Sequence, residues 1–134
     1  MAVSGFLREK NKWTLVRYCQ LQDTLVVGGA SKTLKYFINE YNPDKITTYS
    51  DNMYSNGDMY AKLGFRLVSE SRNPRLYYTN ERGELANRRS FQKAELKKRH
   101  PTLDLTKTER ELAESLGWYQ LWGAKTKKWE FLRT

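Results

Sequence analysis

The first third of the chain changes from a β-like to a helical pattern of apolar residues. Residues 2–8 and 12–20 predict two strands joined by a polar turn, and the second segment is rich in β-branched and aromatic side chains. An apolar run then reaches Gly28 and Gly29, and the residues that follow it have helical spacing: Leu34, Phe37, Ile38 and Tyr41. The predicted order is therefore strand, glycine loop and helix, with the helix ending before Pro43.

The same reasoning assigns elements to the rest of the chain. We expect strands over 45–50, 65–71 and 75–80, a short helix over 55–64 that ends at Gly64, and a turn at Asn73-Pro74. A further helix over 105–117 is predicted to be capped by Thr108. The tail, residues 118–133, predicts a β-hairpin with its turn in GAKTK.

This order of elements predicts an α+β fold, an α/β sandwich with a mixed, mostly antiparallel sheet flanked by helices. Residues 1–80 form the expected core. From residue 81 the chain becomes charged and poor in apolar residues, so 81–134 is expected to form a basic C-terminal extension packed on that core. The length of 134 residues fits a single domain overall.

Charge is the most informative property of the composition. The chain has a net charge of +9, which is typical of proteins that meet a polyanion, although a basic balance also serves solubility alone. The sequence has no apolar run long enough to cross a membrane and no signal-peptide pattern, so we expect a cytoplasmic protein with no membrane partner. Cys19 and His100 are single, so no internal disulfide, Cys/His zinc site or other metal site is predicted.

The segment VVGGASK has the chemistry of an anion site. Its glycines let the backbone turn and present N–H groups, and the helix that follows adds positive charge at its N-terminus. The predicted ligand is a pyrophosphate, and the alternative is a tight turn that holds no ligand. We assign to this candidate cofactor site Val26, Val27, Gly28, Gly29, Ala30, Ser31 and Lys32.

VVGGASKTLKYFI, followed by a strand, a polar stretch and MYAKLGF, resembles the GNAT superfamily of N-acetyltransferases. The resemblance implies acetyl-CoA or a related acyl donor as cofactor, held by the glycine loop with Asn52 nearby. It implies that Tyr60 serves as general acid. Leu25 stands where the family carries Gln or Arg, and the chain lacks the family's first strand and first two helices, so the implied fold is GNAT-like and shortened at its N-terminus.

A closer resemblance covers roughly residues 12–134. It is to a GNAT-like domain of phage proteins that often follows a nuclease domain in homing-endonuclease-type proteins. More weakly, the chain resembles the Mom-type DNA modification proteins of phages. These resemblances imply the cytoplasm of a phage-infected bacterial host and a role on DNA.

Polar groups follow the strand over 45–50 directly. Ser50 and Asp51 stand at its end, where we expect them to orient or deprotonate an amine acceptor. With Tyr60 they form the predicted catalytic set.

Basic side chains form two segments in the C-terminal part of the chain. We expect them to contact phosphates in a salt-dependent manner, and the alternative is a solvated surface. The residues are Arg88, Arg89, Lys93, Lys97, Lys98, Arg99, Lys125, Lys127 and Lys128. Three aromatic residues of the tail, if exposed, are expected to stack on bases: Trp118, Tyr119 and Trp122. The alternative is that they pack in the core, as most large aromatic residues do.

The sequence thus favours an acyl-group transferase of the phage type that modifies DNA bases. One alternative is a non-catalytic DNA-binding or interaction module on the same scaffold, associated with a homing endonuclease. Another is a protein that binds a host protein through its basic surface. A homodimer that pairs exposed sheet edges is also compatible with the shortened fold.

Overall fold

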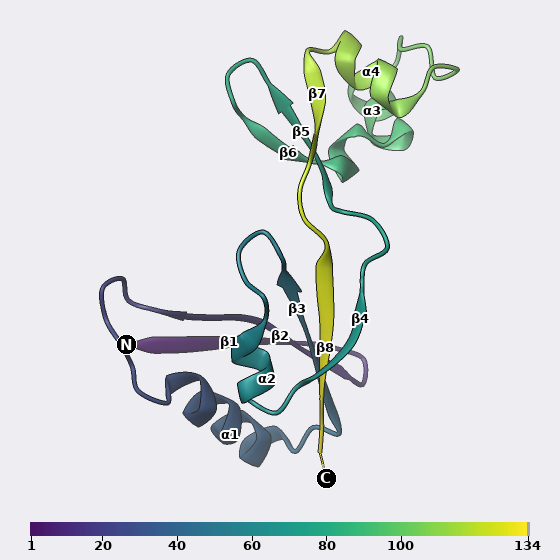
Figure 1. Cartoon of the computed structure of the whole chain (residues 1–134). Coiled ribbons are helices and arrows are strands. Elements are labelled where there is room, and N and C mark those ends of the chain that lie inside the picture. Colours follow the sequence, from purple (N-terminus) through teal and green to yellow (C-terminus); the bar gives the residue numbers. More distant parts are fainter. Residues whose placement is uncertain (134) are drawn as a thin grey trace. The chain divides into compact units, whose positions relative to one another are not determined.

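The computed structural model describes residues 1–133, and these residues fold into two compact units (Figure 1). Unit 1 comprises Met1–Arg72 together with the chain from Lys125 onward. Unit 2 comprises Asn73–Ala124. The predicted α+β class is confirmed, because each unit combines a sheet with helices.

Unit 1 is built on a mostly antiparallel sheet with the strand order β1-β2-β3-β8-β4. Antiparallel pairs join β1 to β2, β3 to β8 and β8 to β4, whereas β2 and β3 run parallel. The elements are β1 (Ala2–Glu9), β2 (Lys12–Gln20), α1 (Gly29–Tyr41), β3 (Lys45–Asp51), α2 (Asp58–Lys62), β4 (Arg66–Glu70) and β8 (Thr126–Leu132).

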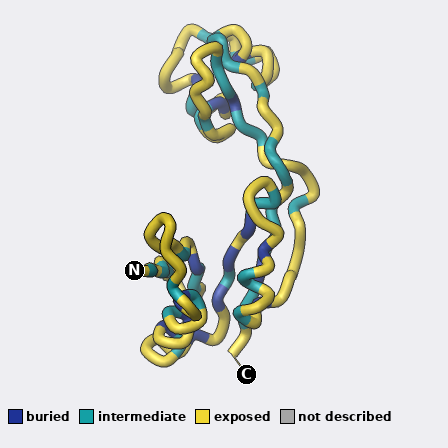
Figure 2. Tube along the Cα trace, turned by 60° about the vertical axis from the view of Figure 1, so that its left-hand side comes forward, coloured by how far each residue is buried: buried dark blue, intermediate teal, exposed yellow. Residues whose placement is uncertain are grey.

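Helices α1 and α2 cover the same face of this sheet. Alternate residues of β3 and β8 point to that face and are buried there, because successive side chains of a strand lie on opposite sides. The buried core consists of Leu15, Leu34, Phe37, Ile46, Phe65 and Trp129. In Figure 2 the buried residues of unit 1 lie along its strands and under its helices.

The parallel strands β2 and β3 separate soon after they meet. Within the described residues, their pairing is confined to Trp13 with Ile46 and Thr14 with Thr47. The buried Thr48 hydroxyl then donates to the Leu15 carbonyl, 2.8 Å away. Beyond this bond each strand continues for several residues, and Figure 1 shows them leaving one another at a wide angle. The carboxyl ends of β2 and β3 are therefore not paired with each other.

Unit 2 has its own small antiparallel sheet, with the order β6-β5-β7, and its own core. Tyr78 of the central strand is fully buried against Phe91, Leu96 and Leu112. The elements are β5 (Leu76–Asn80), β6 (Leu85–Asn87), the 3-10 helix η1 (Arg88–Phe91), α3 (Lys93–Arg99), α4 (Glu109–Ser115) and β7 (Trp118–Trp122).

The predicted C-terminal hairpin is wrong. Strand β7 pairs with β5 in unit 2, and β8 lies between β3 and β4 in unit 1. The connecting residues do not form a hairpin turn, because the Gly123 N–H donates to the Arg75 carbonyl at 2.7 Å. The tryptophans of the tail are accordingly divided: Trp118 packs in unit 2 and Trp129 in unit 1.

The units also divide at positions other than the predicted one. Composition changes at residue 81, but the structural boundaries lie after Arg72 and after Ala124. Strand β5 therefore belongs with the charged segment, and β8 belongs with the N-terminal core. Asn73-Pro74 leads from one unit to the other and does not turn between neighbouring strands.

Candidate functional site

The glycine loop, residues 26–32, forms the N-terminus of α1. Gly28 adopts a left-handed conformation with φ of 65°, and α1 begins at Gly29. The Gly29 N–H donates to the Val26 carbonyl at 3.0 Å, which closes the turn. The first turn of α1 contains no acidic residue. The positive end of this thirteen-residue helix is thus not neutralised by its own side chains.

Close packing at Gly29 requires the absence of a side chain. A Cβ atom there would lie 2.5 Å from the Tyr18 hydroxyl oxygen and 3.0 Å from Val26 Cγ1. Tyr18, near the end of β2, therefore places its hydroxyl directly against the loop. This is the kind of close approach to a helix N-terminus for which glycine is used.

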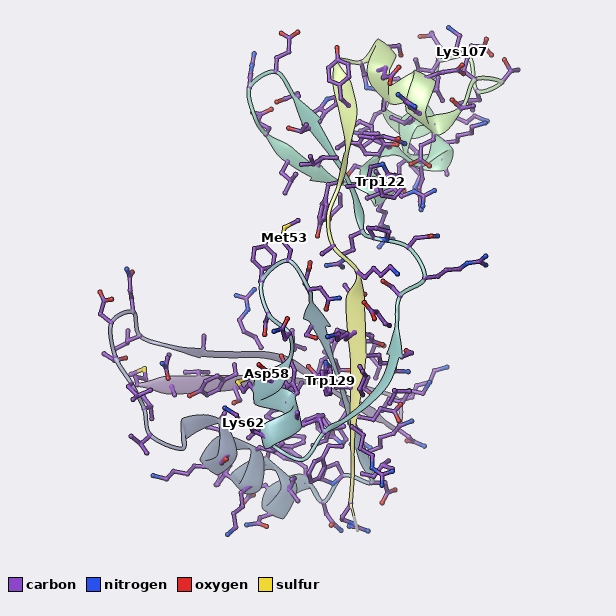
Figure 3. All side chains as sticks on the ribbon, in the orientation of Figure 1. Met53, Asp58, Lys62, Lys107, Trp122 and Trp129 are labelled. Atoms are coloured by element: carbon purple, nitrogen blue, oxygen red, sulfur yellow. The ribbon has the colours of Figure 1, made fainter. Side chains whose placement is uncertain are left out.

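A pocket of about 350 Å³ lies beside the glycine loop. It is called the cofactor pocket below, after the ligand that the sequence predicts. Its lining comes from two segments that lie some thirty residues apart in the chain. One wall is Tyr18, Val26, Gly28, Gly29, Ala30 and Ser31, and the other is Met59, Lys62 and Leu63. Figure 3 shows Lys62 on the side of α2 that faces α1.

The electrostatics of this pocket favour an anion. Its lining contains Lys62 and no acidic residue. The Lys32 side chain also lies near the loop, since its Cε would be 3.7 Å from a Cβ on Gly28. Two ammonium groups and a helix N-terminus together fit the charge of a diphosphate.

The structure separates the predicted cofactor residues into two groups. Five line the pocket: Val26, Gly28, Gly29, Ala30 and Ser31. Val27 does not, and its side chain is 76% exposed. Asn52 is also absent from the lining, because its Nδ2 donates to Glu70 Oε1 at 2.9 Å and its backbone N–H donates to the Lys125 carbonyl.

Ser50 has a structural contact. It is 5% exposed, and its Oγ accepts a hydrogen bond of 2.9 Å from the Trp129 indole nitrogen. A buried indole N–H requires such a partner. The hydroxyl is therefore held inside the core of unit 1, away from the cofactor pocket lining.

Asp51 is the last residue of β3, and Tyr60 is the middle residue of α2. Asp51 Oδ1 accepts from the Met53 N–H at 2.9 Å, and this bond shapes the loop after β3. The Tyr60 ring packs on Phe65 and Trp129, with ring centroids 5.8 and 6.3 Å apart. Neither side chain lines the cofactor pocket.

Sequence reasoning did not assign four residues of the pocket lining, which come from both walls. Tyr18, Met59, Lys62 and Leu63 line the pocket without having been assigned to it. Lys62 and Leu63 belong to the KLGF sequence that carries the family resemblance. Tyr18 had a weaker signal, as an aromatic residue near the end of the strand that precedes the loop.

The predicted phosphate-binding residues belong to two different units. Lys125, Lys127 and Lys128 are part of unit 1, whereas the six residues from Arg88 to Arg99 are part of unit 2. Lys127 donates to the Asn56 carbonyl and Lys128 pairs with Glu130.

Most of the six predicted phosphate-binding residues of unit 2 already have a partner in the fold. Arg88 pairs with Glu109, and Lys98 with Glu95. Lys93 donates to the Leu105 carbonyl and Arg99 to the Ser90 carbonyl. Within the described chain, Arg89 and Lys97 form neither an ion pair nor a side-chain hydrogen bond.

Glu109 links Arg88 to the core of unit 2. Its Oε1 accepts from the Tyr78 hydroxyl at 2.9 Å and from Arg88 Nε at 3.1 Å. Burial, followed by the hydrogen bond and the negative charge of Glu109, raises the pKa of Tyr78. The same carboxylate raises the pKa of Arg88. Arg88 is thus a component of the fold as well as a surface charge.

Comparisons with known proteins do not identify a family: the chain matches no protein-family model and no curated protein. Across residues 1–133, no cluster of three or more His, Cys, Asp or Glu side chains could hold a metal ion. No described helix is both long and apolar enough to cross a membrane.

Proposed function

We propose that unit 1 is an acyl-group transferase of the GNAT type that binds acetyl-CoA or a related donor and modifies nucleic acid. One observation carries the proposal. The two segments on which the family resemblance rests, the glycine loop and the α2 region ending in KLGF, form the two walls of a single pocket.

The position of the pocket adds support. It lies where β2 ends and α1 begins, beyond the point at which the pairing of the parallel strands β2 and β3 ends. Ligands of α/β sheets bind outside the carboxyl ends of the strands, where neighbouring connections diverge. The β2-α1-β3 connection of unit 1 provides this arrangement.

The chain's own residues have distinct parts in the proposed site. The free N–H groups at the start of α1 would bind the cofactor's pyrophosphate, and Lys32 and Lys62 would balance its charge. A bound donor would supply the acyl group. Asp51 is the proposed proton acceptor for an amine, since its carboxylate stands at the end of β3.

The proton donor is a choice between two tyrosines. The family resemblance assigns it to Tyr60, whereas the pocket lining contains Tyr18. Comparing Tyr18→Phe with Tyr60→Phe in a transfer assay with labelled acetyl-CoA separates these assignments. Replacing the tyrosine that donates the proton should lower turnover and leave the affinity for acetyl-CoA within about twofold of wild type.

Calorimetry with acetyl-CoA tests the binding step. We expect Gly29→Val to abolish binding, because the new side chain would overlap the Tyr18 hydroxyl and fill the pocket. Lys62→Ala should weaken binding about tenfold, the effect of losing one charged hydrogen bond. Lys35→Ala is the matched control, since Lys35 is an exposed lysine on α1 outside the pocket lining. Absence of binding at millimolar acetyl-CoA would refute the proposal.

A non-catalytic nucleic-acid-binding module is the second candidate function. It is favoured by the positions of Ser50 and Tyr60, whose side chains pack in the core of unit 1. In that case Asp51→Ala would leave every measurable activity intact, while charge reversal at Lys97 and Lys98 would abolish nucleic-acid binding.

A further inference from the structure

One face of the β6-β5-β7 sheet is not covered by any element of unit 2. The helices of this unit pack against the face that carries Leu76, Tyr78 and Trp118. Figure 1 shows α3 and α4 together on that side. Because side chains alternate along a strand, the opposite face, called the open face here, carries Tyr77, Thr79, Leu85, Asn87, Tyr119 and Leu121.

The open face is aromatic and accessible. Tyr119 is 47% exposed and Leu121 46%, and Tyr77 is half-buried between its neighbours. Strand register places Tyr77 opposite Leu121 and Tyr119 opposite Thr79. The two tyrosines are therefore diagonal neighbours, about 7–8 Å apart along the sheet. Two aromatic rings at this spacing offer successive surfaces for stacking.

Arginines lie at one end of the same face. A pocket of about 370 Å³ is lined by Tyr77, Asn87, Arg75 and Arg89, together with Leu76 and Arg88. The Arg88 guanidinium is paired with Glu109. Arg75 and Arg89 are exposed and have no side-chain partner among residues 1–133. Two unpaired guanidinium groups thus lie beside an accessible aromatic ring.

We propose that the open face binds single-stranded nucleic acid. Bases would stack on Tyr77 and Tyr119, and Arg75 and Arg89 would contact the phosphates beside them. Stacking of this kind needs unpaired bases, because the bases of a duplex are already stacked on one another. A single strand therefore fits these rings better than a duplex does.

This inference extends the nucleic-acid part of the proposed function but does not depend on the cofactor pocket. It also changes which residues should matter. The run of positive charges along residues 88–99 includes Arg89 but not Arg75, whereas the sheet brings Arg75 and Arg89 to one pocket with Tyr77. An acidic protein could bind the arginines, but such binding would not require the rings of Tyr77 and Tyr119.

Fluorescence anisotropy with the full-length protein tests the proposal. The probes are labelled single strands of about 12 nucleotides, as DNA and as RNA, and a duplex of the same sequence. We expect the single strands to bind at least about tenfold more tightly than the duplex. Tyr77→Ala and Tyr119→Ala should each weaken single-strand binding about tenfold. Arg75→Ala and Arg89→Ala should each weaken single-strand binding. Each should also reduce the slope of log affinity against log salt concentration by about the amount expected for one phosphate contact.

Matched controls separate this site from other aromatic and basic residues of unit 2. Trp122 is exposed but pairs with Leu76, on the helix side of the sheet, and Lys107 lies between α3 and α4; both are labelled in Figure 3. Trp122→Ala and Lys107→Ala should bind like wild type. Tyr77→Phe and Tyr119→Phe should retain binding, since phenylalanine keeps the stacking ring.

Three results would overturn the inference. They are equal binding of duplex and single strand, tyrosine-to-alanine variants that bind normally, and a protein that binds no oligonucleotide in low salt. If an alanine variant fails to fold, NMR shifts induced by the single strand in the wild-type protein decide the question. Shifts confined to α3 and α4 would contradict it. Acetyl-CoA affinity, measured in parallel, should not change in the tyrosine variants. A failure of single-strand binding can therefore be distinguished from a failure of the proposed transferase function.

Discussion

At the scale of single residues, two glycines and one serine hydroxyl allow close packing in unit 1. Gly29 allows the Tyr18 hydroxyl to reach the glycine loop. Gly57, at the start of α2, is equally restricted, because a Cβ there would lie 2.5 Å from the Trp129 ring. Ser50 completes this environment by accepting the Trp129 indole hydrogen bond. The junction of β3, α2 and β8 is therefore tightly packed around one tryptophan.

Ser50→Ala should destabilise unit 1 by about 1–3 kcal/mol, because the buried Trp129 N–H loses its acceptor. The free energy of unfolding, measured in urea with Trp129 fluorescence isolated by replacing the other tryptophans, checks this. Ser69→Ala on the exposed strand β4 is the control and should change stability by less than about 0.5 kcal/mol. A catalytic Ser50 would give the opposite pattern, with lost transfer activity and unchanged stability.

At the scale of elements, α4 carries a complete capping box. The Thr108 hydroxyl accepts from the Glu111 N–H, and Glu111 Oε2 accepts from the Thr108 N–H at 2.9 Å. Thr108→Ala should therefore lower the stability of unit 2 by about 1 kcal/mol. Hydrogen exchange of the α4 amides measures this locally. Unchanged protection of these amides would contradict the capping role.

The same capping box gives α4 a defined response to pH. The hydrogen bonds from Thr108 lower the pKa of Glu111 from its ordinary value of 4.5. A lowered pKa contributes stability that is fully present above 4.5 and is lost as the pH falls through the folded-state value. Glu111→Gln keeps an acceptor for the Thr108 N–H but cannot titrate, so α4 protection in this variant should lose that part of its acid dependence.

At the scale of the whole molecule, unit 2 is inserted between two strands of the unit 1 sheet. Strands β4 and β8 are hydrogen-bonded neighbours, although Asn73–Ala124 separates them in the sequence. The Ser71 N–H donates to the Thr126 carbonyl at 2.8 Å, so the chain leaves unit 1 and returns to it at almost the same place. A short linker can therefore join the two ends of the unit 1 chain in place of unit 2.

We expect a chain in which a linker of about four Gly and Ser residues replaces Asn73–Ala124 to fold. Circular dichroism and thermal unfolding should show a cooperative transition, and acetyl-CoA affinity should match that of the full chain under the proposed function. A chain of residues 1–80 is the informative comparison. It keeps the predicted core but lacks β8, which carries Trp129 and joins β3 to β4, so it should not fold. A stable 1–80 chain would contradict this account of the topology.

Local pattern was sufficient for most elements of this protein. Sequence predicted the bounds of several elements within a few residues: the strands over 2–8, 12–20 and 45–50, and the helix that follows the glycine loop. This is possible because the spacing of apolar residues and the capping of helices depend on residues that are close in sequence. Thr108 was identified as a cap for the same reason. The glycine loop was also predicted from sequence, since adjacent glycines before a helix have a local physical meaning.

Tertiary structure decided which strands pair and which side chains meet. The tail predicted a hairpin because β7 and β8 are adjacent in sequence, but burial of Trp118 and Trp129 in separate cores gives each strand other partners. Pairing depends on long-range burial, which local pattern does not encode. Packing also places Ser50 and Tyr60 against Trp129 and brings Tyr18 and Lys62 to the glycine loop, and local pattern does not predict these contacts.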